Sequence, residues 1–301
     1  MTEPDIYPRA EKMNSNLSNL PFNRYQLNVH SQNGEDGVIA ELHKRLGIEV
    51  SNDSWCVEFG AWDGIHLSNT FALVEQGWNA VYIEGDERKY KDLLDTATRY
   101  PKIVPVCAFV ARSSTDESSL DAILRKTTIP PEFSLLSIDI DSYDCDVWES
   151  LTDYMPKIVV IEINSSVPPG VVWRHSDKTS GNTFSATCNV ARRKGYTLVC
   201  HTGNLIFVRD DLVGKLNIDQ RYIDYPELLF QFDGIWVPEN LFREPKPAFA
   251  IVRGFATRLI PKQLLPVVKK TYKALLDRTS EKNHLHDVTS GLDVLQDRRR
   301  R

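Results

Sequence analysis

Four aspartates stand within eight residues in the middle of the chain, directly after the apolar run 133–138: Asp139, Asp141, Asp144 and Asp146. If the segment is extended, Asp139 and Asp141 face the same side, because side chains alternate along a strand. Two carboxylates this close repel each other unless a cation or a proton lies between them. The spacing therefore indicates either a bound metal ion or a general base that takes a proton from a hydroxyl group.

A second pair of oxygen-bearing side chains, Glu162 and Asn164, ends the apolar run 157–163. The carboxyl ends of neighbouring parallel strands meet at one edge of a sheet, so we expect this pair to approach Asp139 and Asp141. The four residues together predict a Mg²⁺ site, where the metal would lower the pKa of a substrate hydroxyl. Two simpler interpretations stay open: Asp139 accepts hydrogen bonds from loop amides, or Asp144 caps a helix over 145–152.

A glycine loop follows the apolar run 55–59 and reads Gly60-Ala61-Trp62-Asp63-Gly64. The two glycines let the backbone turn and approach a ligand closely. Glu58 precedes the loop, and its carboxylate suits an ammonium group better than a pyrophosphate. Glu84 ends the next strand and can accept both hydroxyls of a ribose. The pattern favours S-adenosylmethionine over NAD, with an ordinary strand-to-helix turn and a solvated carboxylate as the structural alternatives.

The elements that must position these residues alternate along the chain. Five apolar runs are expected as strands, over 55–59, 79–83, 102–109, 133–138 and 157–163, and helices are expected between them, over 68–75, 87–98, 116–126 and 146–152. A helix over 183–194 and a hairpin of strands 197–201 and 205–208 follow. Strands that are nearly continuously apolar indicate a parallel sheet covered on both faces. We therefore predict a doubly wound, mostly parallel seven-stranded α/β sheet with a C-terminal antiparallel hairpin, plus an irregular and helical C-terminal extension.

Five segments resemble the FkbM-type family of S-adenosylmethionine-dependent methyltransferases: SQNGEDGVI (31–39), VEFGAWDG (57–64), VYIEGDE (81–87), LLSIDIDSYD (135–144) and GNLIFV (203–208). They lie in about half of the chain, and Trp62 stands where the broader methyltransferase motif has its middle glycine. The resemblance implies that the cofactor's methionine part is held by Gln32, Glu58, Gly60, Ala61, Asp63 and Gly64. We also assign Asn69, Cys107 and Ala108 to cofactor binding. Family members mostly methylate oxygen on sugars or secondary metabolites, so a small-molecule or glycan acceptor is expected.

The long Pro/Gly/Ser-rich segment 165–181 carries Trp173, Arg174 and His175. Long loops at the carboxyl end of a sheet commonly carry function, so we include His175 with Asp139 and Asp141 among the catalytic candidates. An ordered surface loop is the simpler interpretation. No Gly-x-Ser-x-Gly elbow, Walker loop or HExxH sequence is present, so the hydrolase, P-loop and zincin classes lose support.

The charge of −5 is unevenly distributed. Residues 251–301 hold 12 Lys/Arg and 5 Asp/Glu, whereas the preceding 250 residues carry a net charge of −12. An acidic body is a poor nucleic-acid binder, and we expect none. We divide the chain into an arm (1–30), a methyltransferase-like domain (31–250) and a basic helical tail (251–301). Peripheral contact of that tail with an anionic membrane is one hypothesis, and ordinary packing of a helix on the domain is the other.

Five widely spaced cysteines without a CxxC pair predict reduced thiols in a cytoplasmic protein. No apolar run is long enough for a membrane span, and no apolar segment near the N-terminus predicts a secretion signal. The leading hypothesis is an O-methyltransferase acting on a sugar, glycoconjugate or secondary-metabolite hydroxyl. A binding module without chemistry and an NAD-linked enzyme are the alternatives.

Overall fold

The computed structural model describes residues 20–231 of the chain. The predicted basic tail and most of the predicted arm lie outside the described residues. Within the described part of the arm, Phe22 is fully buried next to the short 3-10 helix η3 (Asn23–Tyr25), whereas Leu27 and Val29 are exposed.

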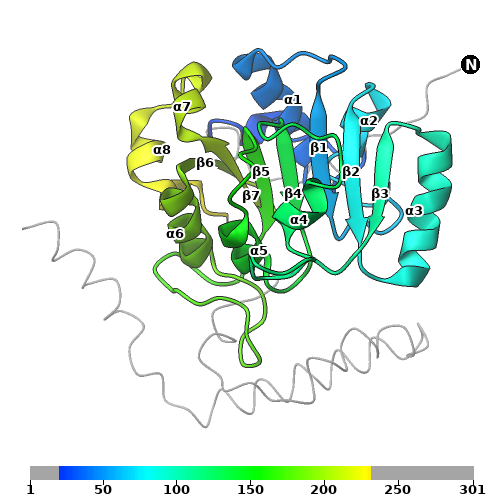
Figure 1. Ribbon diagram of the computed structural model, residues 1–301. Coiled ribbons are helices and arrows are strands. Elements are labelled where there is room, and N and C mark those ends of the chain that lie inside the picture. The colour runs from blue at the N-terminus through cyan, green and yellow to red at the C-terminus, as the bar shows by residue number, and fades with distance from the viewer. Residues whose placement is uncertain (1–19, 232–301) are drawn as a thin grey trace, which may run out of the picture. The chain divides into compact units, whose positions relative to one another are not determined.

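One seven-stranded sheet forms the centre of the fold, in the order β3-β2-β1-β4-β5-β7-β6 (Figure 1). Neighbouring strands from β3 to β5 are parallel, whereas β7 runs antiparallel to both β5 and β6. This confirms the predicted mostly parallel sheet with a C-terminal antiparallel hairpin. The strands are β1 (Trp55–Phe59), β2 (Asn79–Glu84), β3 (Ile103–Cys107), β4 (Leu135–Ile138), β5 (Ile158–Glu162), β6 (Tyr196–His201) and β7 (Asn204–Arg209).

Helices cover both faces of the sheet, as expected for strands that are nearly continuously apolar. One face packs against α1 (Glu35–Leu46), α2 (Phe71–Glu75) and α3 (Glu87–Arg99), and the other against α4 (Leu120–Leu124), α5 (Asp144–Ser150) and α6 (Phe184–Lys194). Figure 1 is seen from the side of α4 and α5. The short elements α7 (Asp210–Val213), η4 (Gly214–Leu216), α8 (Gln220–Asp224) and η5 (Pro226–Leu229) follow the last strand.

Two helices are shorter than the sequence predicted, because the residues expected to form their first turns make other hydrogen bonds. The helix expected over 116–126 spans only α4, since Asp116 and Ser118 form a turn and Ser119 caps the helix through the Ala122 amide. The helix expected over 68–75 begins at Phe71, because the residues before it bind the carboxylate of Glu58. Both losses reflect local hydrogen bonds that compete with helix formation.

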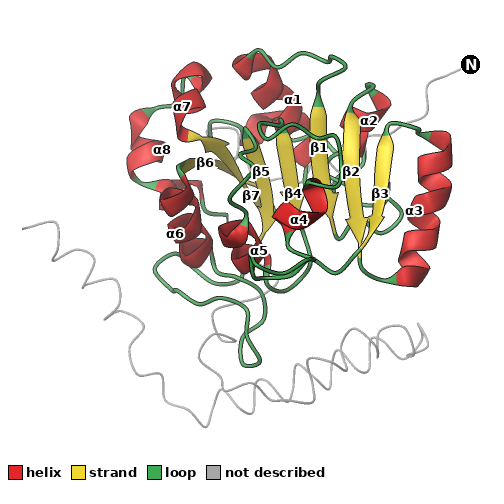
Figure 2. Ribbon diagram, in the orientation of Figure 1, coloured by secondary structure: helices red, strands yellow, loops and turns green. Residues whose placement is uncertain are grey.

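Residues 163–183 join β5 to α6 in a long loop that extends beyond the carboxyl ends of the strands (Figure 2). The loop is tied back to α6 by Thr183, whose hydroxyl accepts a hydrogen bond from the Ala186 amide and donates one to the Trp173 carbonyl. No helix among residues 20–231 is long and apolar enough to cross a membrane.

Candidate functional site

The sheet reverses its strand order between β1 and β4, and ligands of open α/β sheets bind outside the carboxyl ends of strands at such a point. Gly60, directly after β1, touches the chain directly after β4: a Cβ atom on Gly60 would lie 1.9 Å from the carbonyl oxygen of Asp139. Gly60 also has a positive φ of 78°, which L side chains rarely adopt. Glycine is therefore required here to bring the glycine loop and the acidic segment together.

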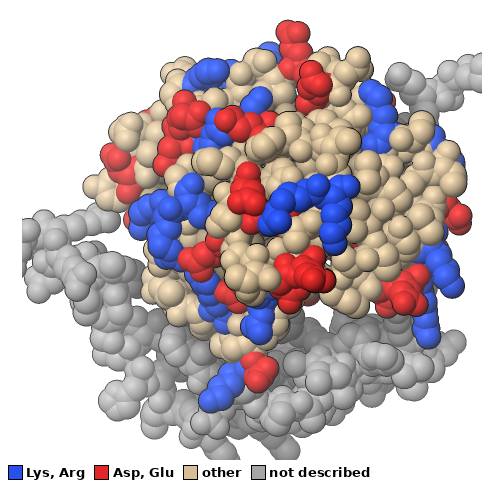
Figure 3. Space-filling model, viewed as in Figure 1, with Lys and Arg blue, Asp and Glu red and all other residues tan. Residues whose placement is uncertain are grey.

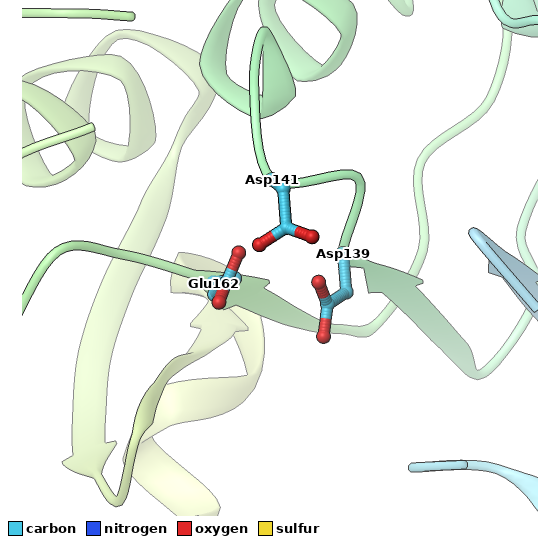
Figure 4. A group of neighbouring side chains, drawn as sticks. All are labelled: Asp139, Asp141 and Glu162. Carbon is cyan, nitrogen blue, oxygen red and sulfur yellow. The ribbon is translucent and has the colours of Figure 1, made fainter. Parts of the chain in front are cut away.

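Three of the predicted acidic residues converge at this edge. One oxygen from each of Asp139, Asp141 and Glu162 lies within 4.8 Å of the others, and the three side chains point toward one another in Figure 4. Asp139 and Asp141 are exposed residues and Glu162 is half-buried, so the group is open to a ligand. The convergence predicted from the spacing of these residues is confirmed.

The electrostatic cost of this arrangement appears in the pKa values of two members. Desolvation of the crowded carboxyl group, followed by the charges of Asp141 and Asp144, raises the pKa of Asp139. Desolvation and the charge of Asp139 raise the pKa of Glu162 as well. Since like charges this close are unfavourable together, the cluster favours holding a proton or a cation near neutral pH.

The fourth predicted metal ligand, Asn164, differs from the other three. Its Oδ1 atom accepts hydrogen bonds from the Ser166 amide at 3.2 Å and the Ser166 hydroxyl at 2.5 Å. Its Nδ2 atom donates to the Ser180 carbonyl. These bonds serve the β5–α6 loop, and a metal-binding role for Asn164 stays a prediction.

A buried pair that the sequence did not single out as a site, Asp144 and Asn182, holds the turn that carries the cluster. The carboxylate of Asp144 accepts hydrogen bonds from the amides of Ile140 (2.9 Å) and Ser142 (3.0 Å), on both sides of Asp141. Asp144 is itself the first residue of α5, whose N-cap residue is Tyr143, so the interpretation that Asp144 caps this helix is wrong. Between these two amides Asp141 adopts a left-handed backbone with φ 58°, a conformation that Asp tolerates better than most residues.

Asn182 connects this turn to the β5–α6 loop. Its Nδ2 atom donates to the Ser142 carbonyl at 2.9 Å, and its Oδ1 atom accepts from the His175 amide at 3.2 Å. Only 1% of Asn182 is exposed. Within residues 20–231 no backbone amide donates to Asp139, so the interpretation that Asp139 binds loop amides is not supported. The neighbours of Asp139, rather than Asp139 itself, shape the turn.

Glu58 is buried at the end of β1, and both of its oxygens already accept hydrogen bonds. The hydroxyls of Ser68 and Thr70 donate to Oε2 at 2.5 Å each, and the Asn69 amide donates to Oε1 at 3.0 Å. Asn69 in turn donates from Nδ2 to the Ser137 hydroxyl in β4. Glu58 thus fixes the segment that returns from the glycine loop, and a direct contact with a ligand ammonium group stays a prediction.

Glu84 closes the other side of the glycine loop. Its carboxylate accepts hydrogen bonds from the amides of Trp62 (2.8 Å) and Asp86 (2.7 Å), and the amides of Gly60 and Ala61 both donate to the Ile83 carbonyl. Each carboxylate oxygen of Glu84 retains acceptor capacity for a further hydrogen bond. The loop is therefore pinned to the end of β2 at the carboxylate predicted to bind a ribose.

Trp62 has a positive φ of 46°, and its indole lies against α3. The indole Nε1 atom donates to Asp92 at 3.3 Å, and the Lys89 ammonium lies 5.3 Å from the ring centroid. In the same loop, Asp63 accepts hydrogen bonds from the amides of Ile65 and His66. A Trp in place of the motif's middle glycine is accommodated because its side chain packs on a helix.

Phe109 is an exposed aromatic residue that the sequence analysis missed. Its ring lies against the backbone of Gly85, since a Cβ atom on Gly85 would be 2.4 Å from the ring, and 78% of Phe109 is exposed. Two predicted cofactor residues precede it: Cys107 is exposed, and the Ala108 amide donates to the Glu84 carbonyl. No signal in the sequence pointed to this role, because the expected strand 102–109 placed Phe109 inside the strand, whereas β3 ends at Cys107.

His175 is held in one tautomer by its surroundings. Its Nδ1 atom accepts a hydrogen bond from the Gly181 amide at 3.2 Å, so the neutral ring carries its proton on Nε2. The ring packs edge-on against Tyr143, with centroids 4.7 Å apart. His175 in this state offers a hydrogen-bond donor to a ligand, and its Nδ1 atom is not available as a base.

Gln32 lies in an exposed loop that is anchored at the same edge of the sheet. Its carbonyl accepts a hydrogen bond from Asn28, and three residues later Glu35 accepts from the Thr202 hydroxyl at 2.6 Å and from Asn204 at 3.1 Å. Asn204 pairs with Glu162 across the β5–β7 ladder. The structure thus brings the Gln32 loop to the hairpin beside the acidic cluster.

No protein-family model matches the chain, and no curated protein sequence is similar to it. Among solved structures, the N-terminal domain of EvdMO1 with SAH bound is 10% identical, with a TM-score of 0.35, over 58% of this chain and 78% of that one. A SAM dependent methyltransferase from Aquifex aeolicus is 9% identical, with a TM-score of 0.34, over 56% and 86%. The Mitomycin 7-O-methyltransferase MmcR is 11% identical, with a TM-score of 0.34, over 57% of this chain and 53% of its own length. Identities this low concern the fold alone, and the FkbM-type resemblance stays a prediction.

Proposed function

We propose that this protein is an S-adenosylmethionine-dependent methyltransferase that transfers a methyl group to a hydroxyl oxygen. The observation that carries the proposal is the meeting of the glycine loop, Glu84 and the acidic cluster (Asp139, Asp141 and Glu162) at the switch point of the sheet. In this proposal Glu84 is the carboxylate that binds the nucleoside and the acidic cluster is the proton acceptor, so that both lie at one edge, as a methyl transfer to oxygen requires.

Several features of this edge fit the cofactor. Gly60 lets the glycine loop lie against the backbone of Asp139, Gly85 lets the Phe109 ring lie against the end of β2, and Glu84 can accept hydroxyl hydrogen bonds from a ribose. The ring of Phe109 offers an exposed apolar face next to Gly85, suited to a nucleobase. The pyrophosphate of NAD would find an acidic environment here, which favours the sulfonium cofactor.

When bound, S-adenosylmethionine supplies an electrophilic methyl group on a positively charged sulfur. The chain's own residues then orient the acceptor and remove its proton. In our proposal a carboxylate of the acidic cluster takes the proton from the acceptor hydroxyl, while the oxygen forms its bond to the methyl carbon and the sulfur–carbon bond breaks. The raised pKa of Asp139 makes it a stronger base than an ordinary carboxylate.

Two further elements are part of the proposal. His175 would donate from Nε2 to the acceptor, since its Nδ1 atom already accepts a hydrogen bond. A divalent cation such as Mg²⁺, held by the acidic cluster, is the second way to activate the hydroxyl. EDTA distinguishes the two modes: it would remove the metal ion and lower activity, whereas it would not affect a carboxylate that acts as a general base.

Three experiments test this proposal in order. Calorimetry with S-adenosylmethionine, S-adenosylhomocysteine and NAD separates a methyltransferase from an NAD-linked enzyme. Formation of S-adenosylhomocysteine with a panel of sugar, glycoconjugate and secondary-metabolite hydroxyls separates catalysis from a binding module without chemistry. Repeating the active reaction with excess EDTA and then Mg²⁺ decides between the metal and the general base.

A further inference from the structure

A polar cavity of about 810 Å³ lies beside the acidic cluster, between the loop after β3 and the start of α5. Arg112, Ser113 and Ser114 form one wall, and Tyr143, Asp146 and Glu149 form the opposite wall. It belongs to the face of the sheet that carries α4 and α5. In the view of Figure 3, basic and acidic side chains are intermixed on this side, so local groups rather than a broad field of one sign decide what binds.

The carboxylates on the α5 wall are already paired. Arg174 donates to Asp146 at 2.8 Å and to Glu149 at 2.6 Å, and Arg193 also contacts Glu149. The hydrogen bond that Arg174 donates to Glu149 lowers the pKa of Glu149 and raises the pKa of Arg174. Arg174 and Arg193 therefore neutralise these two carboxylates, which do not require a cationic group from a ligand.

Arg112 differs from these arginines because no carboxylate pairs with it in residues 20–231. Its guanidinium lies 4.0 Å from the centroid of the Tyr143 ring, so the stacked plane is held in one orientation. Asp116, the remaining acid of the lining, accepts a hydrogen bond from the Ser118 amide within its own turn. Arg112 thus presents a guanidinium without a carboxylate partner among the described residues, next to Ser114 and to Ser113, whose hydroxyl is hydrogen-bonded to the Thr115 hydroxyl and accepts from the Thr115 amide.

Tyr143 connects this cavity to the acidic cluster. It directly follows the turn that carries Asp139 and Asp141, and the edge contact with His175 links it to the β5–α6 loop. A molecule with one group in the cavity therefore extends toward the carboxylates along Tyr143. Arginine with neighbouring hydroxyl donors is an arrangement that matches the several acceptor oxygens of a phosphate.

We propose that this cavity binds a phosphate group of the acceptor, with Arg112 as its main charged contact, so that the methylated molecule is a phosphate ester. The statement that the phosphate belongs to the methyl acceptor rests on the proposed function, whereas the phosphate site itself does not. Phosphate binding can be measured without cofactor or acceptor. Failure of the site is therefore distinguishable from failure of the methyltransferase assignment.

The test is a titration of the full chain with inorganic phosphate, followed by ³¹P line broadening and by the amide resonances of residues 112–114. Arg112→Gln should weaken phosphate binding by at least about tenfold, the scale of losing a charge-assisted hydrogen bond. Arg125→Gln is the matched control, because Arg125 is an exposed arginine paired with Asp153 at 3.3 Å, away from the cavity lining. It should bind phosphate as the unchanged protein does.

Four results would overturn the proposal: no phosphate binding at millimolar concentration, equal binding by Arg112→Gln, acetate binding as tightly as phosphate, or competition between phosphate and S-adenosylmethionine. The last would place the cavity in the cofactor site. An unchanged circular dichroism spectrum, with unchanged amide resonances away from residues 112–114, confirms that Arg112→Gln is folded and that its loss is confined to the cavity.

Discussion

Gly60 and Asp139 are 79 residues apart in the sequence, yet the backbone of one lies directly on the carbonyl oxygen of the other. The contact joins the loop proposed to hold the cofactor to the segment proposed to activate the acceptor. It also means that the two halves of the site cannot move independently without opening this contact.

Gly60→Ala should destabilise the fold and weaken cofactor binding. The added methyl group would lie 1.9 Å from the Asp139 oxygen and would also require a strained φ, at a combined cost of about 2–4 kcal/mol in the free energy of unfolding. Gly47→Ala is the matched control, because Gly47 has a similar φ of 68° and nothing within 4 Å of the added carbon. Urea unfolding of both variants measures the difference. Equal destabilisation would show that the contact with Asp139 has no energetic weight.

The acidic cluster should make stability fall with rising pH. The pKa of Glu162 is raised in the folded chain, so the folded state binds its proton more tightly than the unfolded chain does. That stabilisation is complete below the ordinary pKa of a glutamate and is lost as pH rises through the raised value. Glu162→Gln should therefore flatten the decline of unfolding free energy between pH 5 and pH 9. A variant with the same pH dependence as the unchanged protein would contradict the assignment of the raised pKa.

Asp139→Asn should lower turnover while leaving cofactor affinity nearly unchanged. The amide cannot take a proton from the acceptor hydroxyl, whereas Glu84 and the glycine loop are untouched by the substitution. In the unchanged enzyme, activity should rise with pH through the raised pKa of Asp139, since only the deprotonated carboxylate acts as a base. Initial rates across pH, with calorimetry of S-adenosylmethionine, give both quantities. Full turnover by the variant would remove Asp139 from the mechanism.

Asn182→Ala should cost about 1–3 kcal/mol of stability and also reduce turnover, because it leaves the Ser142 carbonyl and the His175 amide without their buried partner. Asn79→Ala is the control at the amino ends of the strands, where the Asn79 side chain also ties a loop to the sheet, by donating to the carbonyls of Asn52 and Ser54. We expect both variants to lose stability and only Asn182→Ala to lose turnover at saturating cofactor. Equal turnover in the two variants would give Asn182 a purely structural role.

Much of the fold could be predicted from sequence because its signals are local. Runs such as Trp55–Phe59 and Ile158–Glu162 are apolar except for one glutamate each, which fits strands buried on both faces, and their alternation with helical segments implies a parallel sheet. The convergence of Asp139, Asp141 and Glu162 could be predicted because the two aspartates are two residues apart and because Glu162 ends the neighbouring strand. Helix starts were less predictable, because the hydroxyls of Ser68 and Thr70 bind Glu58 instead of joining a helix.

The long-range parts of the site could not be predicted. Asn182 and Asp144 are 38 residues apart, and only the tertiary structure shows that both hold the turn at Asp141. The tautomer of His175 depends on the Gly181 amide, and the packing of Phe109 on Gly85 depends on how β2 and β3 end. Spacing along one strand indicates which side chains share a face, but not which loops fold back over them.

The central claim is that this edge of the sheet binds S-adenosylmethionine through Glu84, and calorimetry of the full chain tests it most directly. The unchanged protein should bind S-adenosylmethionine and S-adenosylhomocysteine but not NAD. Glu84→Ala should weaken that binding by about 1–3 kcal/mol, the scale of lost hydrogen bonds to a charged group, while circular dichroism shows an intact fold. Binding of NAD in place of S-adenosylmethionine, or unchanged affinity in the folded Glu84→Ala variant, would contradict the account.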